Sequence, residues 1–257
     1  MNGAFYVGAV GLQAQQRALD LVANNIANVN TPTFKRSDIR FSEMLAARAD
    51  VEVASASPEP FFAPAGVSAR AAVAIDEPGA VEATGRSMDL AIRGRGFIEL
   101  MGPGGRTLLW RGGALKVGED GLLAAADSGL PLRAAITVPA DAAEILIDAD
   151  GTVRAKTGDA DPPVELGEVG LVLPRDGAAL DRVDGGLFEV ADDAAMDAVR
   201  AGEDGAGTLV QGAVERSNVE MTTQMVELML VQRSYAANAQ IVQAADQMMA
   251  IANGLRR

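Results

Sequence analysis

The chain has 257 residues, a net charge of −13, and neither cysteine nor histidine. The lack of both residue types excludes Ser-His-Asp and Cys-His catalysis, disulfide bonds and ordinary zinc sites. The acidic charge is concentrated in the middle, because residues 46–211 carry −14 while both ends are nearly neutral. An acidic middle flanked by neutral, apolar ends argues against a nucleic-acid-binding protein.

Membrane insertion is not expected, because no apolar run reaches the ~20 residues that a spanning helix needs. The N-terminus has no basic region and no clear cleavage site after an apolar segment. These features argue against a removable secretory signal.

Residues 3–29 have the pattern of a first helix. Apolar residues that include Leu12, Leu19, Val22 and Ile26 recur at steps of three and four. This spacing is the a/d pattern of a coiled-coil-like seam, so we expect these side chains to face a partner helix.

An asparagine-rich segment predicts where this helix ends. Asn24, Asn25 and Asn28 precede Thr31-Pro32, and asparagine favours caps and turns over helix interiors. The residue before a proline also avoids helical ψ angles. The helix should therefore stop near residues 28–30.

The middle of the chain predicts a β-rich domain. A proline-rich stretch reads as an extended connector, preceded by one more helical turn at residues 44–49. Short strand-like segments follow, and Asp120-Gly121 and Asp150-Gly151 each predict a tight hairpin. Residues 191–206 read as a loop or linker, and residues 209–214 as a last strand.

Residues 219–255 predict one long helix, with Ser217 or Asn218 as its N-terminal cap. No proline interrupts this span. At 1.5 Å per residue it is roughly 55 Å long, with apolar residues on more than one side. Such a helix needs partners along its whole length.

The fold class that follows is α+β. The N- and C-terminal helices are discontinuous in sequence and pair as a coiled-coil-like hairpin, and the β-rich domain is inserted between them. The expected divisions are a helical core of residues 1–45 with 212–257, a connector at 46–68, an outer β domain at 69–206, and a C-terminal strand and long helix at 207–257.

Two short motifs resemble ligand sites but lack essential positions. Gly94-Arg-Gly-Phe-Ile-Glu99 has a glutamate where a dinucleotide fingerprint has its third glycine. Asp148-Ala-Asp-Gly151 opens like a calcium loop, yet later ligand positions hold valine and alanine. We therefore expect a glycine kink and a hairpin turn, with no cofactor, no metal and no catalytic residues.

Both ends of the chain resemble flagellar rod and hook proteins. Leu21-Val-Ala-Asn-Asn-Ile-Ala-Asn-Val-Asn-Thr-Pro-Thr-Phe-Lys-Arg36 is similar to the N-terminal signature of that family. Glu215-Arg-Ser-Asn-Val-Glu220 and Gln232-Arg-Ser-Tyr-Ala-Ala-Asn238 resemble its C-terminal signature. The middle is also similar, in Leu90-Ala-Ile-Arg-Gly-Arg-Gly-Phe97. One departure is Thr33, where the family usually has glycine.

The resemblance implies a structural subunit of the bacterial flagellar basal-body rod, the hollow drive shaft that crosses the periplasm. Chain length and Gln13-Ala-Gln-Gln16 lean towards the distal rod branch, then the proximal one. Implied partners are further copies in a helical polymer, other rod and hook subunits, the surrounding ring proteins and the flagellar type III export apparatus. Export would need no cleaved signal peptide. The residues expected to carry assembly and helix packing are Leu12, Leu19, Val22, Asn24, Asn25, Ile26, Asn28, Thr31, Phe34, Lys35, Asn218, Val219, Met225, Val226, Met229, Gln232, Arg233, Tyr235, Asn238, Ile241 and Met248.

Three alternatives remain open from sequence. The chain could be another hook–basal-body paralogue, a secreted carbohydrate-active or binding module with helical appendages, or a chaperone or cap of axial proteins. Two carboxylates in a cleft would favour the second, and absence from purified basal bodies the third.

Overall fold

The computed structural model describes residues 2–47, 62–158, 162–175, 180–183, 186–190 and 196–254. The elements in chain order are α1 (Asn2–Ala27), β1 (Ser37–Ala47), β2 (Phe62–Val73), β3 (Val81–Ala83), β4 (Asp89–Arg93), β5 (Ile98–Met101), η1 (Pro103–Gly105), β6 (Thr107–Trp110), β7 (Gly112–Val117), β8 (Leu123–Ala125), β9 (Glu144–Ile147), β10 (Thr152–Lys156), β11 (Val164–Glu168), β12 (Leu171–Pro174), β13 (Leu180–Val183), β14 (Leu187–Val190), β15 (Met196–Val199), β16 (Thr208–Gln211), β17 (Ala213–Glu215) and α2 (Met221–Gly254). Along the chain, one long helix thus precedes a β-rich middle and another follows it, which makes the fold α+β.

The chain forms two compact units. The helical unit consists of Met1–Ala27, Ser37–Ala72 and Glu220–Arg257, and the β unit of Asn28–Arg36 and Val73–Val219, over their described residues. The sequence placed residues 28–36 and 212–219 with the helices. The structure instead groups both segments with the β unit, because their backbones bond to its strands and loops.

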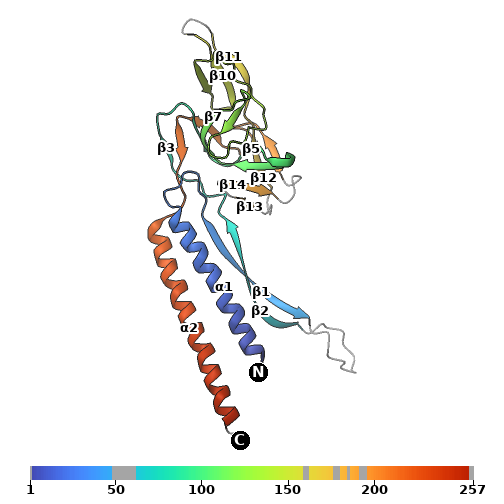
Figure 1. Cartoon of the computed structure of the whole chain (residues 1–257), viewed down its shortest axis with the longest axis vertical. Helices are drawn as coiled ribbons and strands as arrows, with labels where there is room; N and C mark the ends of the chain where they lie inside the picture. The colour runs from blue at the N-terminus through green and yellow to red at the C-terminus, as the bar shows by residue number, and fades with distance from the viewer. Residues whose placement is uncertain are drawn as a thin grey trace. The chain divides into compact units, whose positions relative to one another are not determined.

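In the helical unit, α1 and α2 run side by side in opposite directions, as Figure 1 shows. Gly8 lies against Val242, and Gly11 against Asn238. At Gly8 an added Cβ would stand 2.9 Å from the Val242 side chain, which is closer than real Cβ atoms come. The small residue therefore sets how near the two helices approach.

A β ribbon, β1 with β2, completes the helical unit. The predicted helical turn at residues 44–49 is wrong over its described part, because residues 44–47 continue β1. The extended backbone of Ser37–Ala47 therefore runs through the residues expected to begin that turn. Residues 46–47 and 62–68 of the predicted connector also lie in β1 and β2, and its remaining residues lie outside the described ones.

The β unit is built from small, mostly antiparallel sheets. Two four-stranded sheets, β16-β4-β7-β8 and β13-β14-β6-β5, hold most of the central strands, and smaller groups β11-β10-β9, β12-β15 and β17-β3 join them. Their inner faces enclose a core of fully buried aliphatic residues around Trp110. Each such leucine or isoleucine contributes about 2 kcal/mol by its removal from water.

Both predicted Asp-Gly hairpins are confirmed. β7 pairs with β8 across Asp120-Gly121, and β9 pairs with β10 across Asp150-Gly151. The glycines have φ angles of 76° and 96°, which residues with a Cβ rarely adopt. In each turn the aspartate side chain accepts a bond from the backbone N–H two residues on, as in an Asx turn.

Two predictions at the C-terminal end of the β unit need correction. The segment expected to be a loop at 191–206 contains β15, which pairs with β12. The single strand expected at 209–214 is two strands, because Gly212 has φ 72° and redirects the chain between β16 and β17. β16 then pairs with β4 and β17 with β3.

Across the described residues, neither helix combines the length and apolar character that crossing a bilayer requires.

Candidate functional site

The segment Asn28–Arg36, here called the signature loop, begins with a turn stabilised by Asn28. The backbone N–H of Thr31 donates to the Asn28 carbonyl at 3.1 Å, and the Thr31 hydroxyl donates to the Asn28 side chain at the same distance. The Phe34 N–H then donates back to the Thr31 carbonyl at 3.4 Å. The asparagine and threonine thus end α1 and start a compact turn, as their backbone-competing side chains predict.

Thr33, where the sequence resemblance led us to expect glycine, has a left-handed backbone with φ 61°. For a β-branched residue this conformation is an outlier that costs on the order of 1–3 kcal/mol. Thr33 is buried, and its N–H donates to the Glu215 carbonyl at 2.7 Å. The loop geometry therefore survives the extra Cβ because the surrounding β unit holds it.

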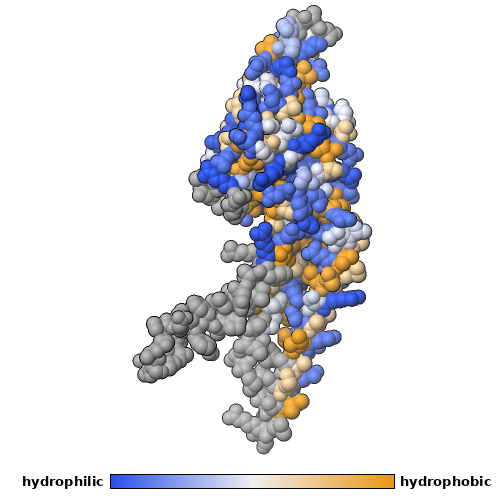
Figure 2. Space-filling view, turned by 180° about the vertical axis from the view of Figure 1, so that it is seen from behind, coloured by the Kyte–Doolittle hydropathy of each residue, from blue (hydrophilic) through white to orange (hydrophobic). Residues whose placement is uncertain are grey.

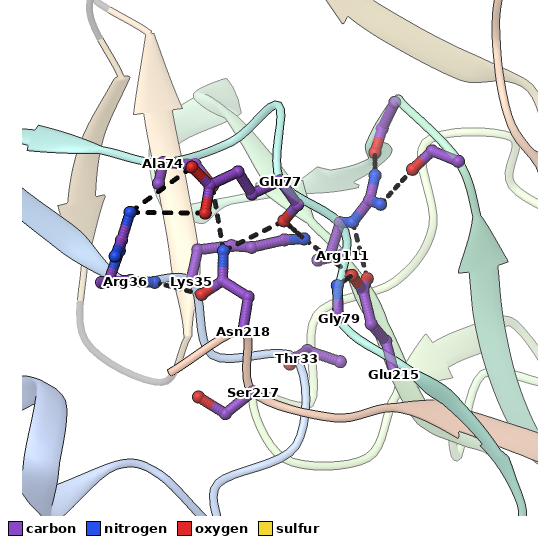
Figure 3. Close-up of polar contacts among 12 residues, drawn as sticks. Thr33, Lys35, Arg36, Ala74, Glu77, Gly79, Arg111, Glu215, Ser217 and Asn218 are labelled. Carbon is purple, nitrogen blue, oxygen red and sulfur yellow. Dashed lines mark hydrogen bonds and ion pairs between the residues drawn. The ribbon is translucent and has the colours of Figure 1, made fainter. Parts of the chain in front are cut away.

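A buried ionic network lies next to this turn, as Figure 3 shows. The Lys35 ammonium donates to Glu215 Oε1 at 2.6 Å, and Arg111 Nε donates to Glu215 Oε2 at 2.8 Å. Gly79 N–H adds a third bond to Oε1 at 2.7 Å. The side chains of Lys35, Glu215 and Arg111 are only 1%, 0% and 1% exposed.

The network holds two cations for one carboxylate. The remaining Arg111 donors bond the carbonyls of Gly94 and Gly96, and Lys35 also donates to the Glu77 carbonyl at 2.9 Å. Burial and then the nearby Arg111 charge lower the pKa of Lys35 below its ordinary value, although Glu215 opposes that shift. Within the network, burial and the Arg111 charge therefore disfavour the protonated form of Lys35, and Glu215 favours it.

Asn218 fastens the C-terminal segment to the signature loop. Its side-chain oxygen accepts from Arg36 N–H at 2.6 Å, and its amide donates to the Ala74 and Glu77 carbonyls at 3.2 and 3.0 Å. The prediction that Ser217 or Asn218 caps the last helix is wrong, because α2 begins at Met221 and the Ser217 hydroxyl bonds Val219 N–H. Both side chains are used within the β unit instead.

Arg182 of β13 covers the signature loop. Its guanidinium lies 4.0 Å from the centre of the Phe34 ring and also donates to the Lys35 carbonyl. A guanidinium over a ring face gains cation–π attraction as well as contact area. Burial lowers the pKa of Arg182, but arginine stays charged at any physiological pH.

In the helical unit, Asn25 is the main polar contact. Its side chain bonds both backbone groups of Ser37, at 3.0 Å to the N–H and 2.9 Å to the carbonyl, and also donates to the Gln224 side chain at 3.0 Å. Asn25, Ser37 and Gln224 are all buried. One asparagine therefore ties α1, the start of β1 and the start of α2 together.

On α1, the most buried residues differ for the most part from the predicted seam residues. The buried residues are Ala14, Ala18, Val22 and Asn25, whereas Leu12, Leu19 and Ile26 are only half-buried. The α1 residues that lie against α2 include Gly8 and Gly11, and at 3.6 residues per turn Leu19 and Ile26 fall close to the direction of Gly8. Among the described side chains, Val22 alone is both a predicted seam residue and buried.

On α2, two faces have different roles. The face toward α1 carries Gln224, Leu228, Val231, Asn238 and Val242, which are buried or half-buried and spaced by three, four or seven residues. At 3.6 residues per turn, the large exposed apolar side chains lie roughly on the opposite side. They are Met225, Val226, Met229, Leu230, Ile241, Met248 and Ile251.

The predicted site residues therefore fall into three groups. The first group belongs to the β unit: Phe34, Lys35 and Val219 are buried, and Asn28 and Asn218 are half-buried. The second belongs to the helical unit: Val22 and Asn25 are buried, and Leu12, Leu19, Ile26 and Asn238 are half-buried. The third group is exposed and consists of Asn24, Thr31, Met225, Val226, Met229, Gln232, Arg233, Tyr235, Ile241 and Met248.

Three central residues were not singled out from the sequence. Glu215 stands in the C-terminal signature, but a single glutamate there is indistinguishable from a surface charge. Arg111 and Arg182 lie in or beside strands, with no motif around them. The one available signal was that Lys35 and Glu215 carry opposite charges and stand in the N-terminal and C-terminal signature segments.

Within the described part of the β unit, one open groove has carboxylates on its wall, and each of them is paired with an arginine. This groove of about 440 Å³ is lined by Glu99, Arg133, Glu168 and Arg200 above an apolar floor. Arg200 donates two bonds to Glu168, at 2.6 and 2.7 Å, which lower the pKa of that carboxyl. A general acid would need its pKa raised instead. Among the described residues, no three carboxylates gather as a metal site would require.

The fold and the signature loop together define a class of protein. Its terminal segments pair as helices, and its β-rich insertion includes the loop that follows the first helix. Family models match in the same order along the chain. "Flagella basal body rod protein" covers residues 5–35, "Flagellar hook protein FlgE/F/G D1 domain" residues 91–155, and "Flagellar basal body rod FlgEFG protein C-terminal" residues 210–255.

Whole-length relatives narrow this class. The chain is 31% identical over 260 residues to the flagellar basal-body rod protein FlgG of Caulobacter vibrioides, covering 98% of this chain and 99% of the relative. It is also 31% identical over 265 residues to FlgG of Borreliella burgdorferi, covering all of both chains. The chain belongs to the FlgG-like flagellar basal-body rod proteins.

Proposed function

We propose that this chain is a structural subunit of the flagellar basal-body rod that polymerises through its terminal helices. The exposed apolar face of α2 is the observation that carries this assignment. Met229, Ile241 and Met248 are 52%, 66% and 65% exposed along that face. Figure 2 shows apolar groups, in orange, at intervals along the helical unit in its lower part.

Such a face on a single chain needs another protein surface. Contiguous exposed apolar patches on soluble proteins mark interaction sites. α1 already occupies the other side of α2, so the exposed side is available for neighbouring subunits. A head-to-tail contact of this kind does not close on itself, which generates a helical filament.

The two units then have separate roles in the rod. The paired helices of the helical unit, with their neutral seams, form the inner tube of the rod, and the acidic β unit forms its outer layer. We propose the distal part of the rod as its place, with other axial subunits above and below, the ring proteins around it, and export through the flagellar apparatus without signal cleavage. The support is the whole-length similarity to proteins named as basal-body rod proteins.

Basal bodies from matched strains test this assignment. Purified basal bodies from wild-type cells should contain the chain within the rod, and a strain without the gene should stop building the rod short of the hook. Complementation with the wild-type gene should restore the full rod. Basal bodies that lack the chain, or rods of full length in the deletion strain, would show that the assignment is wrong.

A further inference from the structure

The ionic network of the β unit joins three segments that are distant in sequence. Lys35 belongs to the signature loop, Arg111 lies between β6 and β7, and Glu215 ends β17, 180 residues after Lys35. Both oxygens of Glu215 are used, and the carboxylate is fully buried. The last strand therefore brings in the negative charge that the two earlier segments require.

Without Glu215, two buried cations would face each other with no carboxylate between them. Glu77 also lies beside Lys35, but its carboxylate pairs with Arg36 and is 61% exposed. Its backbone carbonyl, not its carboxylate, accepts from Lys35. Removing one partner of a buried ion pair is far more costly than removing an exposed one, because the remaining charge stays desolvated.

We propose that Glu215 is a positioning residue that couples the two ends of the chain: the signature loop reaches its native conformation only when β16 and β17 have docked and delivered Glu215 to Lys35. A subunit then presents an ordered signature loop only after nearly its whole length has folded. The coupling is a property of the single chain and does not depend on polymerisation.

The backbone provides direct reporters of this coupling. Thr33 N–H donates to the Glu215 carbonyl at 2.7 Å, and Arg36 N–H donates to the Asn218 side chain at 2.6 Å. Both amides are protected from exchange while the 215–218 segment is docked on the loop. Leu123 N–H, which donates to the Ile136 carbonyl at 3.0 Å, lies elsewhere in the β unit and reports its general stability.

Hydrogen exchange on the full-length protein, kept dilute enough to be monomeric by light scattering, tests the proposal. In Glu215→Gln, exchange at Thr33 and Arg36 should rise on the order of a hundredfold, as expected for a broken buried pair. Leu123 should be affected at least tenfold less. The control Glu82→Gln removes the exposed partner of Arg216 on the strand beside β17 and should leave all three amides unchanged.

Lys35→Met separates positioning from general packing. It removes the surplus cation, so Leu123 should keep its protection while Thr33 and Arg36 exchange faster. The double variant Lys35→Met/Glu215→Gln should lose less protection at the loop than the two single losses multiplied together. The proposal is overturned if loop and Leu123 amides lose protection equally in Glu215→Gln, if Lys35→Met leaves the loop amides unchanged, or if the two effects simply multiply. If Glu215→Gln fails to fold, the Lys35→Met result alone decides.

Discussion

The two units of this protein bury opposite kinds of side chain. The β unit encloses most of its large apolar residues and also buries the charged side chains of Lys35, Asp89, Arg111 and Glu215. The helical unit buries alanines and amides, and leaves methionines, leucine and isoleucines of α2 in contact with solvent. The β unit therefore has a large apolar core of its own, whereas the helical unit leaves large apolar side chains exposed on the face of α2 that we propose contacts other subunits.

This difference separates folding from assembly in one molecule. A substitution in the β unit should change the free energy of unfolding of the monomer. A substitution on the exposed face of α2 should change polymerisation and leave the monomer nearly as stable as before. The predictions below test this separation, from the largest expected effect to the smallest.

A charge on the exposed face of α2 should abolish polymerisation. In Met229→Glu the carboxylate would have to be desolvated in every subunit contact, which is far more unfavourable than its exposure in the monomer. Pelleting and electron microscopy should find no filaments, while the free energy of unfolding of the monomer stays within about 0.5 kcal/mol of wild type.

Val164→Glu is the matched control in the other unit, since Val164 of β11 is 58% exposed. The same kind of substitution on an equally exposed apolar residue should leave polymerisation intact. Normal filaments from Met229→Glu, or their loss in Val164→Glu, would contradict the assignment of α2 as the assembly face.

The same leucine-to-alanine change should have opposite consequences in the two units. Leu100 is fully buried in the β-unit core, so Leu100→Ala should lower the free energy of unfolding by about 3 kcal/mol. Leu230 is 59% exposed on α2, so Leu230→Ala should change it by less than about 0.5 kcal/mol. Urea unfolding of monomeric protein measures both values. Similar losses at the two positions would show that the division of roles is mistaken.

Relief of backbone strain at Thr33 should stabilise the protein. Glycine adopts φ 61° without penalty, although it gains entropy in the unfolded state, so Thr33→Gly should raise the free energy of unfolding by about 1 kcal/mol. Thr33→Ala keeps the Cβ and serves as the control that should gain little. Thermal melts of the three proteins compare them, and a loss of stability in Thr33→Gly would show that the threonine side-chain contacts outweigh the strain.

The pH dependence of stability should reveal the buried Lys35. Burial and Arg111 lower its pKa in the folded protein below the ordinary 10.5, against the attraction of Glu215 and Glu77. Between the folded pKa and 10.5 the unfolded state binds more protons, so the Lys35 contribution to stability rises with pH. The free energy of unfolding of wild type minus that of Lys35→Met should therefore increase as the pH rises towards 10.5 (about 1.4 kcal/mol per pH unit at most). A decrease would mean that Glu215 dominates and the pKa is raised.

Sequence patterns predicted the helices and turns better than they predicted which segments pack on them or pair with them. The helix ends near Asn28 because asparagine and proline act on the local backbone. The Asp-Gly hairpins form because glycine adopts a positive φ without strain. Leu12, Leu19 and Ile26 of the predicted a/d seam are only half-buried, since the pattern marks apolar residues without saying whether a neighbour in the same chain or another chain covers them. β15 was missed because a short, half-exposed strand depends on pairing with β12.

The sequence by itself determined the two long helices, the β-rich middle, the turn chemistry and the absence of histidine and cysteine catalysis, because each of these follows from local conformational preference or composition. Family resemblance at both ends also came from sequence alone. Only the tertiary structure brought Lys35, Arg111 and Glu215 together and placed the signature loop with the β unit, because burial and charge compensation arise from segments far apart in the chain. It also decided which side of α2 is covered, since that depends on where α1 packs against it.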